Sequence, residues 1–167
     1  MHSAGFAQLD TETLYALLRL RVDIFVVEQH CAYPELDGRD TEPATVHLWL
    51  TAAGDPAPLG YLRILSESDG SARIGRVAVA PSARGAGAAR RLMTAALDRI
   101  GDQPCVLDAQ AGLVGFYRSL GFAVTGAEYL EDGIPHVPMR RDAHAAAVRR
   151  PYGKAATISS TGLRRPV

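Results

Sequence analysis

A glycine-rich stretch, PSARGAGAARRL at residues 81–92, places the strongest constraint on the fold of this 167-residue chain. It follows the apolar run ARIGRVAVA (72–80) and opens the segment GAARRLMTAALDRIG (87–101), whose apolar residues recur at helical spacing. The run PCVLDAQ (104–110) then predicts a short buried strand. A strand, a helix and another strand in this order predict a parallel pair of strands joined by a right-handed crossover.

Two further strand-like segments precede this unit. TVHLWLTA (45–52) alternates apolar and polar residues, and LGYLRIL (59–65) follows it. The turn-type sequences AAGDPAP and SESDGS connect these segments to ARIGRVAVA, which predicts an antiparallel meander. The predicted fold class is therefore mixed α/β, with the meander followed by the βαβ unit in a central mixed sheet flanked by helices.

The remaining segments predict helices, strands and one long loop. Leucines recur at helical spacing over residues 11–25, and Asp10 can cap this helix. Residues 26–43 lose all periodicity and carry several acidic side chains, which predicts an ordered loop of functional length. GLVGFYRSLGF (112–122) predicts a short helix, and residues 123–139 predict two strands around the turn EDG.

Length and charge limit the class of protein. A zero net charge and this length fit one domain, which we expect to span residues 1–141, followed by a basic, alanine-rich tail (142–167) outside the core. The charge balance disfavours nucleic acid or a membrane as partner, and no apolar run approaches the roughly 20 residues that span a bilayer. The N-terminus lacks signal-peptide character, so we expect a cytoplasmic location. Cys31 and Cys105 make no disulfide framework, and His30–Cys31 lacks a second ligand pair, so we expect no metal site.

The glycine-rich stretch itself allows more than one interpretation. GAGAAR is similar to the dinucleotide pattern G-x-G-x-x-G, and Asp108 follows about 20 residues later, as that pattern requires. Arg90 at the third glycine position and the four residues PSAR before the first glycine disfavour it. Alternatively, Arg84, Gly87 and Ala89 form R-x-x-G-x-A, in which successive backbone N–H groups and the helix start surround a pyrophosphate. A glycine- and alanine-rich helix start that merely packs tightly is the third possibility.

Motifs on both sides of this stretch occur in the order found in one enzyme superfamily. VAV (77–79), the glycine-rich loop and FYRSLGF (116–122) resemble the acetyl-CoA-binding core of the GNAT N-acetyltransferases. The likeness covers roughly residues 5–141 and implies that the two strands of the βαβ unit splay apart. Further stretches resemble the ElaA-like branch of the superfamily, namely FVVEQ (25–29), LDGRD (36–40), IGRVAV (74–79), DAQ (108–110) and EDGIPH (131–136).

The resemblance implies acetyl-CoA as the donor, with its pantetheine arm filling the gap between the splayed strands. Backbone groups of Val77 and Val79 would hydrogen-bond the amides of this arm, and the Val79 N–H would polarise the thioester carbonyl. Gln110 stands where the family usually carries Asn, which contacts the arm or orders the start of the following helix. The implied donor-binding residues are Val77, Ala78, Val79, Arg84, Gly85, Ala86, Gly87, Ala88, Ala89 and Gln110.

Tyr117 in FYRSLGF is the catalytic acid that the resemblance implies, because a phenol beside the leaving thiolate can protonate it or hydrogen-bond it. Its neighbour Phe116 is expected in the core. Many family members carry a basic Glu on the strand that matches residues 74–79, where this chain has Arg76. His136 is the preferred replacement, since imidazole is a common general base. The candidates for the base are Glu28, Asp37, Asp40, His47 and His136.

We expect the acceptor to contact the 26–43 loop and the EDGIPH turn. The candidate substrate residues are Arg21, Glu28, Tyr33 and Asp37, with acidic side chains that would attract a cationic amine. An alternative left open is that Arg21 and Glu28 pair with each other and hold the first helix against the loop.

The predicted function is transfer of an acetyl group from acetyl-CoA to a primary amine by direct attack in a ternary complex. No Cys or Ser suggests an acyl-enzyme. The alternative is a non-catalytic acetyl-CoA-binding module that regulates a partner. The acceptor would be a small-molecule or peptide amine, and the sequence leaves its identity and the oligomeric state open.

Overall fold

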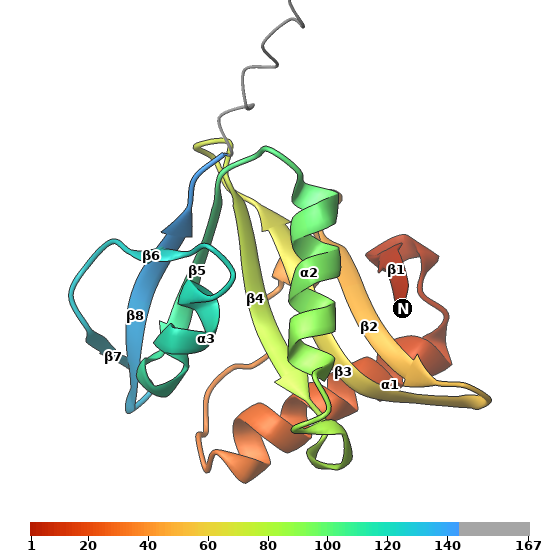
Figure 1. Cartoon of the computed structure of the whole chain (residues 1–167). Helices are drawn as coiled ribbons and strands as arrows, with labels where there is room; N and C mark the ends of the chain where they lie inside the picture. The colour runs from red at the N-terminus through yellow and green to blue at the C-terminus, as the bar shows by residue number, and fades with distance from the viewer. Residues whose placement is uncertain (144–167) are drawn as a thin grey trace, which may run out of the picture.

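An eight-stranded mixed sheet forms the centre of the computed structural model, which describes residues 1–143 (Figure 1). The strand order is β1-β2-β3-β4-β5-β8-β6, and β7 pairs with β8. Within the described residues, β4 and β5 are parallel and the other paired strands are antiparallel. The strands are β1 (His2–Gly5), β2 (Val46–Ala52), β3 (Asp55–Ser66), β4 (Ala72–Val79), β5 (Cys105–Gln110), β6 (Ala123–Val124), β7 (Tyr129–Glu131) and β8 (Ile134–Arg141).

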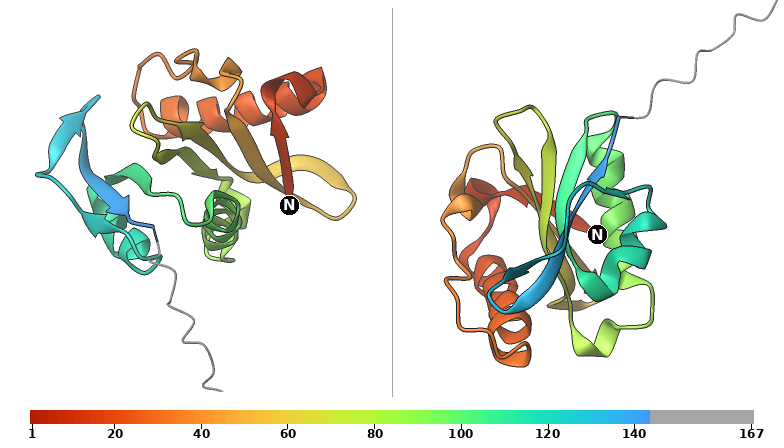
Figure 2. Two further views of the ribbon diagram at one scale, coloured as in Figure 1. Left: turned by 90° about the horizontal axis from the view of Figure 1, so that it is seen from above. Right: turned by 90° about the vertical axis from the view of Figure 1, so that its left-hand side faces the viewer.

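Helices cover both faces of the sheet (Figure 2). They are α1 (Thr11–Val22), which lies on one face, and α2 (Ala88–Ile100) and α3 (Val114–Arg118), which lie on the other. Asp10 caps α1 as predicted, since its carboxylate accepts the Thr13 N–H at 2.7 Å. A π-helical turn (Asp23–Glu28) extends α1 toward the site described below.

Two apolar clusters hold these layers together. The larger lies between the sheet and α2, where Leu62 and Leu92 are completely buried. The smaller lies under α1, where Leu17 packs near Tyr61 of β3. Gly60 permits the close approach of α2, because a Cβ there would lie only 2.8 Å from Leu92 Cδ1. Both helices are thus fixed against the same central strand.

The parallel strands β4 and β5 separate soon after they start (Figure 1). Beyond their start, the register of β4 against β3 shifts by one residue between Gly75 and Ala78, and Arg76 in this bulge has a φ of 55°. A bulge bends and twists its strand, which turns β4 away from β5. The divergence confirms the splayed pair that the resemblance implied. The only register pairs between the two strands are Ala72 with Cys105 and Arg73 with Val106.

The predicted meander and βαβ unit are both confirmed. The helix predicted over 11–25 ends its regular part at Val22, and the one in 112–122 is regular only over Val114–Arg118. Strand β1 was not predicted, because HSAG has no apolar alternation and is held by backbone pairing with β2. Strand β3 begins within the predicted turn, at Asp55. Apart from its first two residues, the predicted tail lies outside the described part of the chain.

Candidate active site

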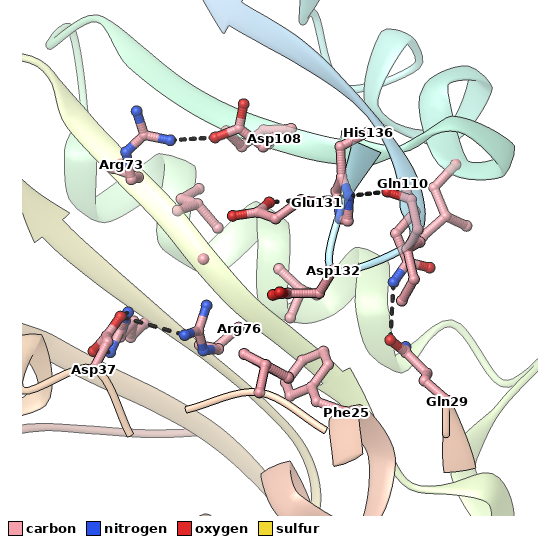
Figure 3. A pocket seen from close by; sticks show the side chains of 18 of the residues that line it. Phe25, Gln29, Asp37, Arg73, Arg76, Asp108, Gln110, Glu131, Asp132 and His136 are labelled. Atoms are coloured by element: carbon pink, nitrogen blue, oxygen red, sulfur yellow. Dashed lines mark hydrogen bonds and ion pairs between the residues drawn. The ribbon is translucent and has the colours of Figure 1, made fainter. Parts of the chain in front are cut away.

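A cavity of about 480 Å³ opens where β4 and β5 diverge (Figure 3). Ile74 and Val77 of β4 and Leu107 of β5 supply apolar walls, while the β7–β8 hairpin and the 29–40 segment supply polar groups. This volume falls within the range of about 300–1,000 Å³ that is usual for small-molecule sites. The splay therefore creates a ligand-sized space between the two halves of the sheet.

The loop before α2 presents backbone N–H groups that lack acceptors. Gly85 and Gly87 have φ values of 74° and 78°, a region that favours glycine. The first hydrogen bond of this helix start is donated by the Arg91 N–H to the Gly87 carbonyl, at 3.0 Å. Within the described residues, the N–H groups of residues 85–90 have no acceptor. Together with the positive end of the 13-residue helix α2, they form an arrangement that suits an anion.

The edge of β4 that faces the splay also has free backbone groups. The Ala80 N–H donates to the Leu59 carbonyl at 3.0 Å, so the neighbouring pair Gly60–Val79 is a non-hydrogen-bonded pair. The N–H and C=O of Val79 therefore point away from β3. On that side the Arg84 Nε donates to the Val79 carbonyl at 3.2 Å, which leaves the N–H of Val79 directed toward the gap.

Arg84, predicted to bind phosphate, is engaged by a carboxylate. Its Nη2 lies 2.8 Å from Glu28 Oε2, at the end of the π-helical turn. The hydrogen bond from Arg84 lowers the pKa of Glu28, although both side chains are exposed. The pair between Arg21 and Glu28 that the sequence left open is therefore wrong, because Glu28 faces the glycine-rich loop.

Tyr117 projects from α3 into the cavity. Its side chain is only 6% exposed, and its ring packs edge-on against Phe122 with centroids 6.1 Å apart. No group in residues 1–143 hydrogen-bonds its hydroxyl. Burial raises the pKa of Tyr117 to about 12, so the phenol stays protonated at neutral pH and retains a free donor. Phe116, expected in the core, is only partly buried against it.

His136 lies on β8 opposite Gln110 of β5 and lines the same cavity. Its Nδ1 is 2.9 Å from the Ile134 carbonyl, which can only accept a hydrogen bond. In the neutral imidazole this contact assigns the proton to Nδ1 and leaves the Nε2 lone pair available. Glu131 Oε2 lies 3.9 Å from the same Nδ1. The side chain is therefore oriented as a potential proton acceptor.

Comparison with known proteins identifies the family. Residues 25–143 match the model of the acetyltransferase (GNAT) domain. The chain belongs to the GNAT acetyltransferase family. Escherichia coli ElaA is 40% identical over 142 residues, which cover 81% of this chain and 92% of ElaA. A UPF0039 protein of Mycobacterium tuberculosis is 49% identical over 146 residues, 86% of this chain and 92% of that protein.

Solved structures agree with this assignment. The crystal structure of E. coli ElaA has a TM-score of 0.78 at 37% identity, covering 84% of this chain and 97% of that one. An acyl-CoA N-acyltransferase from Pseudomonas aeruginosa has a TM-score of 0.79 at 42% identity, with the same coverage of 84% and 97%. The GNAT fold and the ElaA-like resemblance are thereby confirmed.

Arg21, predicted to contact substrate, is instead a buried anchor of this GNAT domain. Its side chain is 1% exposed and lies 2.8 Å from both Glu35 and Asp40. Burial opposes its charge, but hydrogen bonds to the two carboxylates outweigh burial and raise its pKa. Arg21 therefore fixes the 29–42 segment to α1 and does not reach the cavity.

Tyr33 and Asp37 do line the cavity, but both already contact arginine side chains. Asp37 pairs with Arg63 and with Arg76, and Tyr33 lies under the Arg76 guanidinium at 5.6 Å. Burial disfavours ionisation of Asp37, but Arg63 outweighs burial and lowers its pKa to about 2. Asp37 therefore lies in the cavity as predicted, but with its charge balanced by arginines; its attraction for the acceptor stays a prediction.

Two candidate bases are excluded by their position. His47 is 2% exposed, lies 2.7 Å from the Tyr61 hydroxyl and 3.1 Å from the Asp40 carbonyl, and does not line the cavity. Burial also lowers the pKa of His47. Asp40 is buried between Arg21 and Arg63. His136 is left as the cavity-lining candidate without an arginine partner.

Several cavity residues were missed. Gln110, predicted to contact the cofactor, donates from Nε2 to Gln29 Oε1 at 3.2 Å, and Gln29 was not assigned a role. Asp108, considered only for a dinucleotide, lies 2.5 Å from Arg73 and shares the Gln110 face of β5. The period-two alternation of DAQ could have placed Asp108 there. Phe25, Cys31, Leu113, Asp132 and Ile134 also line the cavity without having been named as site residues.

Within residues 1–143 no group of three or more His, Cys, Asp or Glu side chains could hold a metal. No helix in that part of the chain is long and apolar enough to cross a membrane.

Proposed function

We propose that this GNAT protein transfers an acetyl group from acetyl-CoA to a primary amine by direct attack in a ternary complex. The observation that carries the proposal is the Tyr117 hydroxyl, which opens into the cavity at the splay from an otherwise buried side chain and has no partner within residues 1–143. Such a hydroxyl is free to hydrogen-bond a ligand in the cavity. A leaving thiolate is such a ligand.

The donor would lie along β4, with its pyrophosphate on the free N–H groups of residues 85–90. The positive φ of Gly85 and Gly87 and the open space beside them allow phosphate oxygens to approach the backbone. Arg84 is close enough to this loop to exchange Glu28 for phosphate. The pantetheine arm would pair with the free edge of β4 at Val77 and Val79.

The chemistry would then proceed without a covalent enzyme intermediate. The amine nitrogen forms a bond to the thioester carbonyl carbon, whose oxygen is stabilised by the Val79 N–H. His136 Nε2 takes the proton that the nitrogen loses, and Tyr117 donates to the sulfur as the C–S bond breaks. Neither thiol is placed as a nucleophile: Cys105 is completely buried, which raises its pKa to about 11, and the Cys31 thiol donates to the Asp132 carbonyl.

The test is a thiol-release assay with acetyl-CoA and a panel of primary amines, together with binding of CoA by calorimetry. We expect CoA to bind and free thiol to appear only when an amine is present. Binding of CoA without thiol release from any amine would favour the alternative, an acetyl-CoA-sensing module. Thiol release without amine that labels a cysteine would contradict direct attack.

A further inference from the structure

Within residues 1–143, every arginine that lines the cavity is already paired with carboxylates. Each of its four arginines contacts two carboxylates, and these contacts come from different elements of the fold. The pairs are Arg39 with Glu42 and Glu67, Arg63 with Asp37 and Asp40, Arg73 with Glu67 and Asp108, and Arg76 with Glu35 and Asp37. An acceptor with a carboxylate or phosphate would therefore meet arginines whose charge is already balanced.

Two carboxylates of the cavity are not engaged by arginine. Glu131 and Asp132 project from the β7–β8 hairpin into the space between the Arg73–Asp108 and Asp37–Arg76 pairs (Figure 3). In residues 1–143 the Asp132 carboxylate has no hydrogen bond or ion pair, and Glu131 has only the 3.9 Å contact with His136.

The position of Asp132 is determined by its turn. Asp132 and Gly133 have φ values of 49° and 82°, both positive, as in a type I′ hairpin turn. The Asp132 carbonyl also accepts the Cys31 thiol at 3.3 Å, which connects the hairpin to the segment across the cavity. The free carboxylate is thus held at the cavity mouth by backbone geometry and by a contact from the opposite wall.

A second observation also points to a ligand in this cavity. The Tyr117 hydroxyl, on a side chain only 6% exposed, has no partner and faces the same space. The deep part therefore offers a neutral donor among the apolar side chains Ile74 and Leu107, while the mouth offers uncompensated negative charge. A ligand that fits both would be apolar in its middle and positively charged at its outer end.

We propose that the acceptor is a diamine or polyamine whose distal ammonium binds at Glu131 and Asp132 while its other amine is acetylated. This inference rests on the proposed function, because it names the substrate class of the same site. An ammonium there gains two carboxylate neighbours and meets no free cation. A monoamine lacks this contact, and an amine with a distal carboxylate would be repelled.

The test compares three substrates of equal length in the thiol-release assay: butylamine, 1,4-diaminobutane and 4-aminobutanoate, repeated with the hexyl series. Because the two carboxylates are exposed, we expect kcat/KM for the diamine to exceed that of the monoamine by about fivefold to tenfold. The amino acid should be the poorest of the three. High salt should reduce the difference between diamine and monoamine.

Two substitutions test whether Asp132 and Glu131 cause the preference for the diamine. Asp132→Asn should lower the ratio of diamine to monoamine kcat/KM toward one, mainly through KM, and Glu131→Gln should lower it further. Glu128→Gln is the matched control, since Glu128 is exposed just before β7 and does not line the cavity; the ratio should be unchanged. Equal use of diamine and monoamine, or a preference that survives both substitutions, would overturn the inference while leaving the proposed function intact. Absence of thiol release with every amine would overturn both.

Discussion

Replacing Tyr117 by Phe removes the hydroxyl but keeps the aromatic ring, so it tests whether the hydroxyl itself is needed for catalysis. The ring keeps its packing against Phe116 and Phe122 in this change. The hydroxyl has no partner in the described residues. Its loss should therefore change the free energy of unfolding by no more than about 0.5 kcal/mol.

The expected effect on turnover is much larger. Removing a general acid typically costs about 10²–10⁴-fold in rate, or roughly 3–5 kcal/mol in the barrier. The affinity for acetyl-CoA should stay within about threefold, because the loop and the β4 edge are unchanged. Since the pKa of Tyr117 is about 12, no loss of rate below about pH 11 should come from its ionisation.

The assay measures kcat by thiol release, acetyl-CoA affinity by calorimetry and stability by thermal unfolding. Tyr15→Phe, on the exposed surface of α1, is the matched control and should change none of the three. A variant that keeps kcat within threefold would refute the role of the hydroxyl. A fall in kcat matched by a large fall in stability would make Tyr117 a packing residue.

Four further results are expected. Gly87→Val should abolish CoA binding measured by calorimetry, because its φ of 78° strains a branched residue and the side chain enters the phosphate space. Arg21→Met should lower the free energy of unfolding by about 3 kcal/mol, because it leaves buried carboxylates behind. The pKa of Asp37 is lowered to about 2, so its ionised form stabilises the folded state. This contribution to the free energy of unfolding, about 1 kcal/mol after solvent screening, is complete above about pH 4 and is lost as the pH falls toward 2. His136→Gln should lower kcat about 100-fold, with partial rescue by added imidazole.

Each of these has a contradicting outcome. If the Gly87 variant still binds CoA, the glycine-rich loop does not bind the donor. Arg19→Met breaks an exposed pair on the same helix and should cost under about 1 kcal/mol, so equal losses for Arg19 and Arg21 would argue against a buried anchor. Asp37→Asn should flatten the acid-unfolding curve between pH 4 and 2, and an unchanged curve would contradict the linkage. An unaltered kcat in the His136 variant would show that another group is the general base.

The elements of the fold were largely predictable because their signals are local. The glycine-rich loop, the Asp10 cap and the amphipathic α2 each depend on residues within one or two turns of one another. Strand β1 was missed because its residues show no apolar alternation and it is held by pairing with the distant strand β2, and the π-helical turn after α1 has no distinct periodicity. Of the predicted site, Tyr117 and His136 both line the cavity.

The sequence by itself determined the order of most elements, the family and the position of the glycine-rich loop, since these follow from spacing and from motifs read along the chain. Only the tertiary structure decided which carboxylate meets which arginine. Arg21 pairs with acids 14 and 19 residues away rather than with Glu28, which pairs with Arg84 across 56 residues. Ion pairs act through space, so their partners depend on how the sheet brings distant segments together, and within residues 1–143 the Asp132 carboxylate is left without an arginine for the same reason.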